Sequence, residues 1–293
     1  STSGIATSGV FVSNINQVES GFLAAITDDG TQRIWGTYTG GGHNTSVEGV
    51  AIWGNKIAVG GRTMSQIQIA TANSFQPNFF QGAFVQAFAQ VFNDDGTIHW
   101  GTYYGGQFST QGTAVAVWDN HLYLVGNTNS GNNIATPGAH QETRFDEHAF
   151  LVKLDDEGDR VWGTYVGGNM EDYINSITAY QDMLVVAGGT RSTQFITSAN
   201  AHQTANAGDM DGFINAFNSD GNFLWGTYIG GENKDEIKRI VHFNNGSFLV
   251  GGNTDGSTTG IATAGTHQTN FFGGPDDAFL VKFCTVPNLE IIE

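Results

Sequence analysis

A motif of seven residues, Trp-Gly-Thr-Tyr followed by one variable residue and Gly-Gly, occurs four times in this chain of 293 residues. The copies begin at Trp35, Trp100, Trp162 and Trp225, and the spacings between them are 65, 62 and 63 residues. A repeat of this length indicates a series of similar supersecondary units, each of which packs against its neighbours. The repeat therefore limits the fold more strongly than any other feature of the sequence.

A short apolar segment precedes each copy of the motif, and a fifth copy of the segment follows the last period. It begins at Phe22, Phe88, Phe150, Phe213 and Phe279. In the first four copies it runs into an acidic or polar turn closed by glycine, such as Asp28-Asp29-Gly30. Apolar runs of this length between turn residues are typical of strands. Asp-Gly favours a hairpin, because glycine readily adopts the positive φ of the turn.

Two further apolar segments follow each Gly-Gly pair. The first begins at Val50, Val115, Ile177 and Ile240. The second begins at Ile57, Leu122, Leu184 and Phe248. A loop of the Ile-Ala-Thr type then returns, and in three copies it continues into His-Gln, at His140, His202 and His267. Each period is therefore expected to contain four strands and one long loop.

We predict an all-β fold, a β-propeller whose blades are four-stranded antiparallel sheets of about 63 residues each. Four full periods plus one extra strand correspond to four or five blades, or to part of a larger ring. Residues 1–283 are expected to form this single domain, and residues 284–293 a C-terminal tail or linker. Each blade has two apolar faces, so we expect the Trp and Tyr rings of the motif to seal neighbouring blades together.

The combination of these motifs resembles the bacterial beta-propeller repeat family. The resemblance rests on the Ile-Ala-Thr-x-Gly-x-His-Gln loop, the segment Asp277 to Phe283, the Asp-Gly turn and the Trp-Gly-Thr-Tyr motif, and it covers residues 4–283. It implies a propeller fold in a secreted or outer-surface protein, commonly of the Bacteroidetes type. That family has no shared catalytic residues, so none is assigned here.

The composition restricts the classes of partner. The chain has 28 acidic and 11 basic residues, which gives a formal net charge of -17. Such a charge repels phosphate, so nucleic-acid binding is not expected. The sequence contains no apolar run long enough for a membrane-spanning helix, so membrane insertion is not expected. The single cysteine, Cys284, excludes an internal disulfide.

Three groups of polar residues are candidate sites. The acidic turn at Asp155 to Asp159 offers oxygen ligands, but a hairpin seldom supplies the six that calcium needs, so we expect a solvated turn and no cofactor, with calcium as the alternative. The histidines at 140, 202 and 267 recur once per period, too far apart for a zinc site, and are expected to satisfy backbone groups. The pairs Glu171–Asp172 and Asp235–Glu236 are expected to be surface or capping acids rather than a glycosidase pair.

The candidate ligand-binding residues are the aromatic residues that end the third segment of each period: Trp53, Trp118, Tyr180 and Phe243. In the resembling family this position is usually Asp. Aromatic platforms suit sugars, because the apolar C–H faces of sugars stack on π surfaces. The alternative is that the rings are part of the core. Exposure to solvent distinguishes the two.

These observations predict a non-catalytic, extracellular binding or adhesion module that binds carbohydrate. The expected partners are a glycan or a surface protein, and neighbouring modules are expected in a longer chain. The first alternative is a carbohydrate-active enzyme, a glycoside hydrolase or lyase, with acids at the central channel. The second is a structural spacer. No catalytic or metal-binding residue is predicted.

Overall fold

A computed structural model describes residues 4–15, 19–144, 147–244, 246–256, 261–271 and 273–284. These residues form 17 β-strands, and no helix occurs among them. Consequently no helix in this part of the chain could cross a membrane. Contacts divide the chain into two compact units, Ser1–Val166 and Gly167–Glu293, which are described separately.

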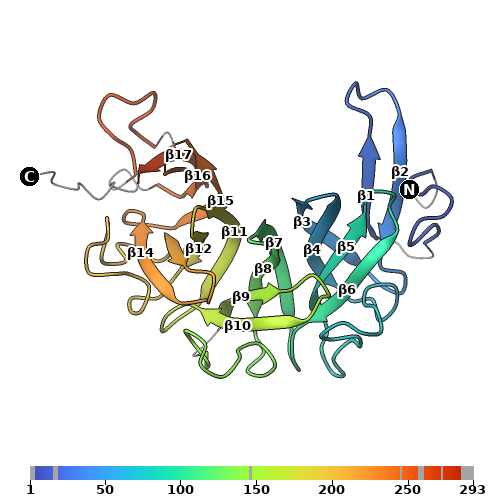
Figure 1. The fold of residues 1–293 in the computed structure, drawn as a ribbon. Coiled ribbons are helices and arrows are strands. Elements are labelled where there is room, and N and C mark those ends of the chain that lie inside the picture. Colours follow the sequence, from blue (N-terminus) through green and yellow to red (C-terminus); the bar gives the residue numbers. More distant parts are fainter. Residues whose placement is uncertain are drawn as a thin grey trace, which may run out of the picture. The chain divides into compact units, whose positions relative to one another are not determined.

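The first unit contains a strand pair and two four-stranded sheets (Figure 1). In the pair, β1 (Gly21–Ile26) lies antiparallel to β2 (Arg33–Thr39). The first full sheet has the order β3 (Thr45–Trp53), β4 (Lys56–Thr63), β5 (Gln86–Asn93) and β6 (Ile98–Tyr104). The second has the order β7 (Thr110–Trp118), β8 (His121–Thr128), β9 (His148–Leu154) and β10 (Arg160–Val166).

The second unit contains one four-stranded and one three-stranded sheet. The four-stranded sheet has the order β11 (Asp172–Tyr180), β12 (Met183–Thr190), β13 (Asp211–Phe217) and β14 (Phe223–Ile229). The three-stranded sheet has the order β15 (Asp235–Phe243), β16 (Ser247–Thr254) and β17 (Asp277–Cys284). Neighbouring strands in both sheets are antiparallel.

Each complete sheet is therefore an up-and-down unit of four antiparallel strands, as predicted from the repeat. Within the first unit, β7 lies against β3, β4 and β5 of the preceding sheet. Within the second, β15 lies in the same way against β11, β12 and β13. The fold is β-propeller-like in this respect, because the first strand of one sheet packs over the face of the previous one.

Apolar side chains fill the space between stacked sheets. In the first unit, Ala58 and Ala89 of one sheet share a core with Leu124 and Phe150 of the next. In the second, Val185 and Ile214 share a core with Phe248. Neither sheet of a pair could bury this surface alone, so burial requires the repeat.

The first strand of each sheet after the β1–β2 pair is longer than the sequence predicts. β3, β7, β11 and β15 each begin five residues before the apolar segment, for example at Thr45 rather than Val50. Each also contains a register shift, which in β3 lies between Val47 and Gly49. A bulge interrupts the alternation of two on which strand prediction depends, so the polar first half is missed.

The Trp-Gly-Thr-Tyr strands are bonded along both edges. On one edge they pair with the preceding strand, so that Tyr103 lies opposite Phe88 and Trp100 opposite Val91. On the other edge they meet the long loop. In the β6 copy, the Thr71 amide donates to the Gly101 carbonyl at 2.8 Å, and the Tyr103 amide donates to the Gln76 carbonyl at 3.1 Å. The same two bonds recur at β10 and β14.

Three of the four motif residues have a specific role in this arrangement. The glycine allows the loop to approach, because a Cβ on Gly101 would lie 2.1 Å from the Ile69 carbonyl oxygen. The threonine hydroxyl accepts the loop amide, as Thr102 does from Gln76 at 2.9 Å. The tyrosine hydroxyl donates to a buried carbonyl, as Tyr103 does to Ser65 at 2.8 Å. Equivalent bonds occur at Tyr165 and Tyr228.

The tryptophans pack less uniformly than the other motif residues. Trp35 and Trp100 are buried, at 4% and 3% exposure, and their indole rings cover Gly96 and Gly158 of the following hairpin turn. Trp162 and Trp225 are half-buried. The prediction that the indoles seal neighbouring sheets is confirmed for the first two copies.

We expect Gly101→Ala to destabilise the protein by about 1–3 kcal/mol, because the new methyl group would collide with the Ile69 carbonyl. Urea denaturation of the variant and the parent would measure this. Gly131→Ala is the matched control, since the nearest atom to its Cβ would be Arg144 Nε at 3.8 Å. Equal stabilities for the two variants would contradict the close approach of the loop.

Candidate functional site

The four aromatic candidates do not share one environment. In the first unit, Trp53 ends β3 and is 6% exposed. Its indole Nε1 donates to Asn120 Oδ1 at 2.9 Å, and the Lys56 ammonium lies 5.6 Å from its ring centroid. Trp53 belongs to the core cluster between the sheets. It therefore lacks the open face that a stacking platform requires.

Trp118 occupies the same position at the end of β7 and is half-buried. Its ring packs against Tyr123 at 6.0 Å, and Tyr123 in turn contacts Trp162 at 6.1 Å. Tyr123 therefore contacts both indole rings. Part of its surface is left open to solvent.

In the second unit, Tyr180 and Phe243 end β11 and β15. Tyr180 is half-buried and stacks on the His242 imidazole, with ring centroids 4.0 Å apart and an interplanar angle of 15°. Phe243 is 42% exposed, and the Lys282 ammonium lies 5.7 Å from its ring centroid. Of the four candidates, Phe243 is the one whose ring is clearly open to solvent.

The acidic turns use their oxygens within the turn. Asp155 Oδ1 accepts the amides of Glu157 at 3.1 Å and Asp159 at 2.8 Å. In the Asp29 turn, bonds from Thr27 and Thr31 lower the pKa of the carboxyl group to about 2. Among the residues that the structure describes, no group of three or more His, Cys, Asp or Glu side chains is placed to hold a metal ion. These acids therefore stabilise their own turns by accepting hydrogen bonds within them.

In the His-Gln pairs, the glutamine and the histidine have different surroundings. The glutamines satisfy backbone groups: Gln141 Nε2 donates to the Thr143 carbonyl, and Gln203 Nε2 donates to the Ala205 carbonyl, both at 3.0 Å. Burial lowers the pKa of the His140 imidazole. His202 instead meets the edge of the Phe283 ring at 6.2 Å.

The acid pairs predicted as surface or capping residues separate into two kinds. Glu171 lies at the surface and pairs with Arg191 at 3.2 Å. Asp172 is fully buried, as the first residue of β11. Its carboxylate accepts the Gly168 amide at 2.7 Å, the Ser192 hydroxyl at 3.0 Å and the Thr190 hydroxyl. Of the two positions expected, surface or capping, Asp172 therefore takes the capping one, and its donors replace the water that burial removes.

Sequence reasoning missed this row of polar residues at the strand starts. In the first unit the same positions hold threonines, and Thr45 and Thr63 share a hydrogen bond of 2.7 Å. Thr110 and Thr128 repeat it at 2.8 Å. The sequence signal is the threonine that ends the last apolar segment of each period, at Thr63, Thr128, Thr190 and Thr254. Nothing local shows that its partner lies five residues before another apolar segment.

Asp211 and Asp235 bring two buried carboxyl groups close together at the start of β13 and β15. Asp211 Oδ2 accepts the Ala207 amide at 2.9 Å and Gln203 Nε2 at 2.7 Å, whereas its buried Oδ1 has no hydrogen-bond partner among the described residues. Burial raises the pKa of Asp211 to about 6, and the charge of Asp235 adds to the rise. Burial of one carboxylate beside another favours the protonated acid.

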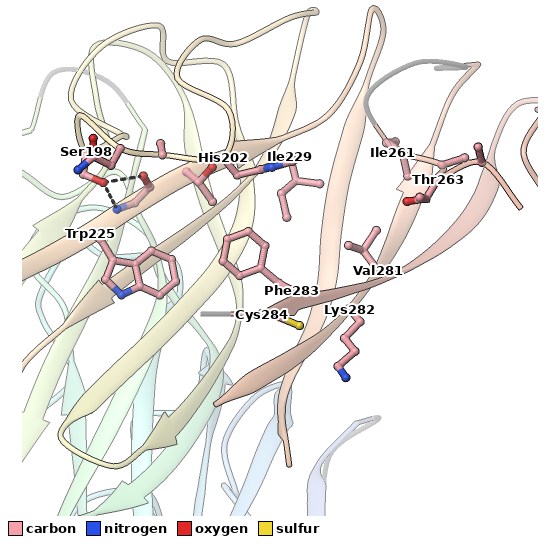
Figure 2. A pocket seen from close by; sticks show the side chains of 16 residues that line it. Ser198, His202, Trp225, Ile229, Ile261, Thr263, Val281, Lys282, Phe283 and Cys284 are labelled. Atoms are coloured by element: carbon pink, nitrogen blue, oxygen red, sulfur yellow. Dashed lines mark hydrogen bonds between the residues drawn. The ribbon is translucent and has the colours of Figure 1, made fainter. Parts of the chain in front are cut away.

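A pocket of about 1180 Å³ lies within the second unit (Figure 2). Its lining comes from β14, from the loop at Ser198 to His202, from the loop at Ile261 to Ala264 and from β17. The Trp225 and Phe283 rings stack there, with centroids 6.0 Å apart and an interplanar angle of 18°. In Figure 2, Trp225 and His202 lie on one side of Phe283, and the loop with Ile261 and Thr263 lies on the other.

Comparisons with known proteins leave the family open. No protein-family model matches the sequence, and no curated protein matches it. One solved structure to which the chain is similar is titled "Phage phi92 endosialidase", with 12% sequence identity and a TM-score of 0.43. The similarity covers 84% of this chain and 37% of that chain, so this chain spans well under two thirds of its length. A likeness at this level identifies neither the family nor the activity of this chain.

We expect Asp211→Asn to remove a pH-dependent cost to folding. The pKa of Asp211 is raised from 3.8 to about 6 in the folded protein, so its contribution to stability is fully present below about pH 4 and is lost as the pH rises through about 6. The difference corresponds to at most about 3 kcal/mol. Urea denaturation should find the variant more stable than the parent near pH 7.5 and the two similar near pH 4.

Asp220→Asn is the control for this experiment, because Asp220 lies exposed in a hairpin turn of the same unit. It should leave the slope of stability against pH unchanged. Identical slopes for the parent and Asp211→Asn would show that Asp211 does not titrate as a buried acid.

Proposed function

We propose that the chain is a β-propeller, or part of a larger ring, that acts as a non-catalytic binding module at the outer cell surface or outside the cell. The stacking of successive antiparallel sheets within each unit supports the ring. The acidic composition and the resemblance to secreted propeller repeats support the setting. A propeller presents a broad surface of loops and strand ends, which suits recognition without chemistry.

The ligand we favour is a glycan, and the exposed ring of Phe243 is the observation that carries this choice. Phe243 ends β15 with 42% of its surface exposed, beside the Lys282 ammonium. An open aromatic face stacks on sugar C–H groups, while an adjacent ammonium donates hydrogen bonds to hydroxyl or carboxylate oxygens. Trp118 offers a second, smaller platform of the same kind in the first unit.

The disposition of the acids favours binding over hydrolysis. A glycosidase needs two carboxyl groups that flank one accessible bond, one of them with a raised pKa. The pKa of Asp211 is raised in this way, but its side chain is buried at the start of β13 rather than exposed beside a substrate. A carbohydrate-active enzyme therefore remains the less favoured alternative, and a structural spacer explains the fold but not the open ring.

We expect Phe243→Ala to weaken glycan binding by roughly tenfold or more, because truncation removes the stacking surface. A glycan array with the parent protein would identify the ligand, and calorimetry with that glycan would measure both affinities. The thermal midpoint should fall less than on truncation of a fully buried ring, since 42% of Phe243 is already exposed. Phe84→Ala is the matched control, because Phe84 is 72% exposed but lies outside the four strand-end positions.

The array and the titrations should give the same result with calcium and with a chelator, since the binding proposed here uses no metal ion. Failure of the parent to bind any glycan, or equal affinities for the Phe243 and Phe84 variants, would contradict the proposal.

A further inference from the structure

Three oxygen-bearing residues lie at one end of the second unit, where β13 and β15 start and β16 ends. Asp211 is the first residue of β13, Asp235 is the first residue of β15, and Thr254 is the last residue of β16. All three are buried, with exposed fractions of 0%, 0% and 6%. Asp235 and Thr254 are opposite each other in the β15–β16 pair, so their side chains lie on the same face of that sheet.

The two carboxyl groups flank the same pair of glycines. The Gly231 amide donates to Asp235 Oδ2 at 2.7 Å. A Cβ on Gly230 would lie 2.7 Å from Asp211 Oδ1, so this oxygen reaches the other glycine of the pair. The Asp235 amide also donates to the Met210 carbonyl at 2.7 Å, which holds the start of β15 against the residue before Asp211. Two acidic groups from neighbouring sheets are therefore held close together and away from water.

Two buried oxygens at this place have no hydrogen-bond partner among the described residues, namely Asp211 Oδ1 and Thr254 Oγ1. The hydroxyl is the more informative, because its counterparts in the other sheets are bonded. Thr63 and Thr128 each share a hydrogen bond with the threonine opposite, and the Thr190 hydroxyl donates to the carboxylate opposite. A threonine at this position therefore directs its hydroxyl toward the first residue of the adjacent strand. Leaving such a group buried without a partner is costly.

No basic side chain of the described residues is placed to neutralise the two acids. The second unit contains five Lys and Arg residues, and each of them is engaged elsewhere. Arg191 pairs with Glu171, Lys234 and Lys238 pair with Glu236, Arg239 donates to the Asn175 carbonyl, and the Lys282 ammonium lies over the Phe243 ring. Burial of a carboxylate without a counter-charge is unfavourable. The site therefore lacks both a positive charge and a partner for its hydroxyl oxygen.

A cation supplies both of these, whereas a proton or a water molecule supplies one. A proton neutralises one carboxyl group but gives Thr254 Oγ1 no partner, and a water molecule bonds to the hydroxyl but carries no charge. Carboxylate and hydroxyl oxygens are hard ligands, which calcium prefers, and two carboxylates match its charge.

The last repeat also has room for further ligands beside Asp235. In the preceding repeat the Ser192 hydroxyl fills the corresponding space and donates to Asp172 at 3.0 Å. The residue at that position of the last repeat is Gly256, and the nearest atom to a Cβ there would be Asn233 Nδ2 at 3.2 Å. Water molecules can take the place of the missing serine side chain and complete the coordination of an ion.

We propose that Asp211, Asp235 and Thr254 form a binding site for one calcium ion, which joins the sheet of β13 to the sheet of β15. Asp211 Oδ1, the Asp235 carboxylate and Thr254 Oγ1 are the protein ligands, and water supplies the rest of the about six to eight oxygens that calcium requires. The site is separate from the acidic hairpin turns, whose carboxylates bond within their own turns. The ligands come together only in the folded unit, so the ion stabilises it.

Calcium titration of protein that has been stripped of metal with a chelator tests the site. Calorimetry with calcium chloride at pH 7.5 should show one bound ion per chain. The thermal midpoint should rise by roughly 5 °C when calcium exceeds its dissociation constant about a hundredfold. Magnesium at the same concentration should raise the midpoint much less, because it demands a smaller, octahedral set of ligands.

Two substitutions locate the ion. Asp211→Asn and Thr254→Val should each weaken calcium binding by roughly tenfold or more. In calcium-free buffer Thr254→Val should be at least as stable as the parent, because valine keeps the shape of threonine without the unpartnered hydroxyl. Asp220→Asn is the matched control, since Asp220 is an exposed acid of the same unit, and it should bind calcium as the parent does. Phe243→Ala should also bind calcium normally, so this proposal and glycan binding fail independently.

Absence of both a binding heat and a midpoint shift with calcium would overturn the proposal. Calcium binding that Asp211→Asn and Thr254→Val leave unchanged would place the ion elsewhere and overturn this site. A calcium-free Thr254→Val protein less stable than the parent would overturn the role of the hydroxyl as a ligand. An equal midpoint shift with magnesium would overturn the assignment to calcium.

Discussion

The double-edged bonding of the Trp-Gly-Thr-Tyr strands is the interaction on which the rest of the structure depends. Each of β6, β10 and β14 is paired with a strand on one side and with a loop on the other, although that loop precedes both strands in the sequence. A strand at a sheet edge normally exposes its backbone groups. Here the loop satisfies some of these backbone groups, so this edge of each four-stranded sheet is covered. The same arrangement recurs in every complete sheet of the described residues.

This constraint explains why the motif has four fixed residues. Gly101 admits the Ile69 carbonyl, Thr102 receives the Gln76 amide, and Tyr103 reaches the Ser65 carbonyl. The tryptophan acts over a longer range, because Trp100 covers Gly158 in the next sheet of the same unit. The glycine, threonine and tyrosine bind the edge strand of a sheet to its loop, and the tryptophan packs that sheet against its neighbour.

The buried polar row at the strand starts shows how copies of one repeat diverge. Where the first unit has Thr45 and Thr110, the second has Asp172 and Asp235. Three donors surround Asp172, but position 256 is glycine where the preceding repeat has Ser192, so the Asp235 site lacks the equivalent hydroxyl. Burial and the charge of Asp235 both raise the pKa of the neighbouring Asp211, and protonation of Asp211 lowers the cost of burying its carboxyl group there.

Much of the fold could be predicted from the sequence, because turn residues and apolar runs recur with a fixed period. The number, order and pairing of the strands follow from that pattern, whereas the polar starts of β3 and β15 do not, since a bulge hides them. The candidate site was less predictable. Trp53 and Phe243 occupy equivalent positions, yet one is buried under Asn120 and Lys56 and the other is open. Exposure depends on side chains from neighbouring strands, which no local pattern reveals.

Amide hydrogen exchange of the motif tyrosines tests the central claim most directly. The amides of Tyr103, Tyr165 and Tyr228 each donate to a glutamine carbonyl of the loop at 3.1 Å, on the edge that would otherwise face solvent. If the loop closes each sheet, these three amides should exchange only with the global unfolding of their unit. Exchange at the rate of an unstructured peptide, while the amides paired within the sheet remain protected, would show that the loop does not hold the strand.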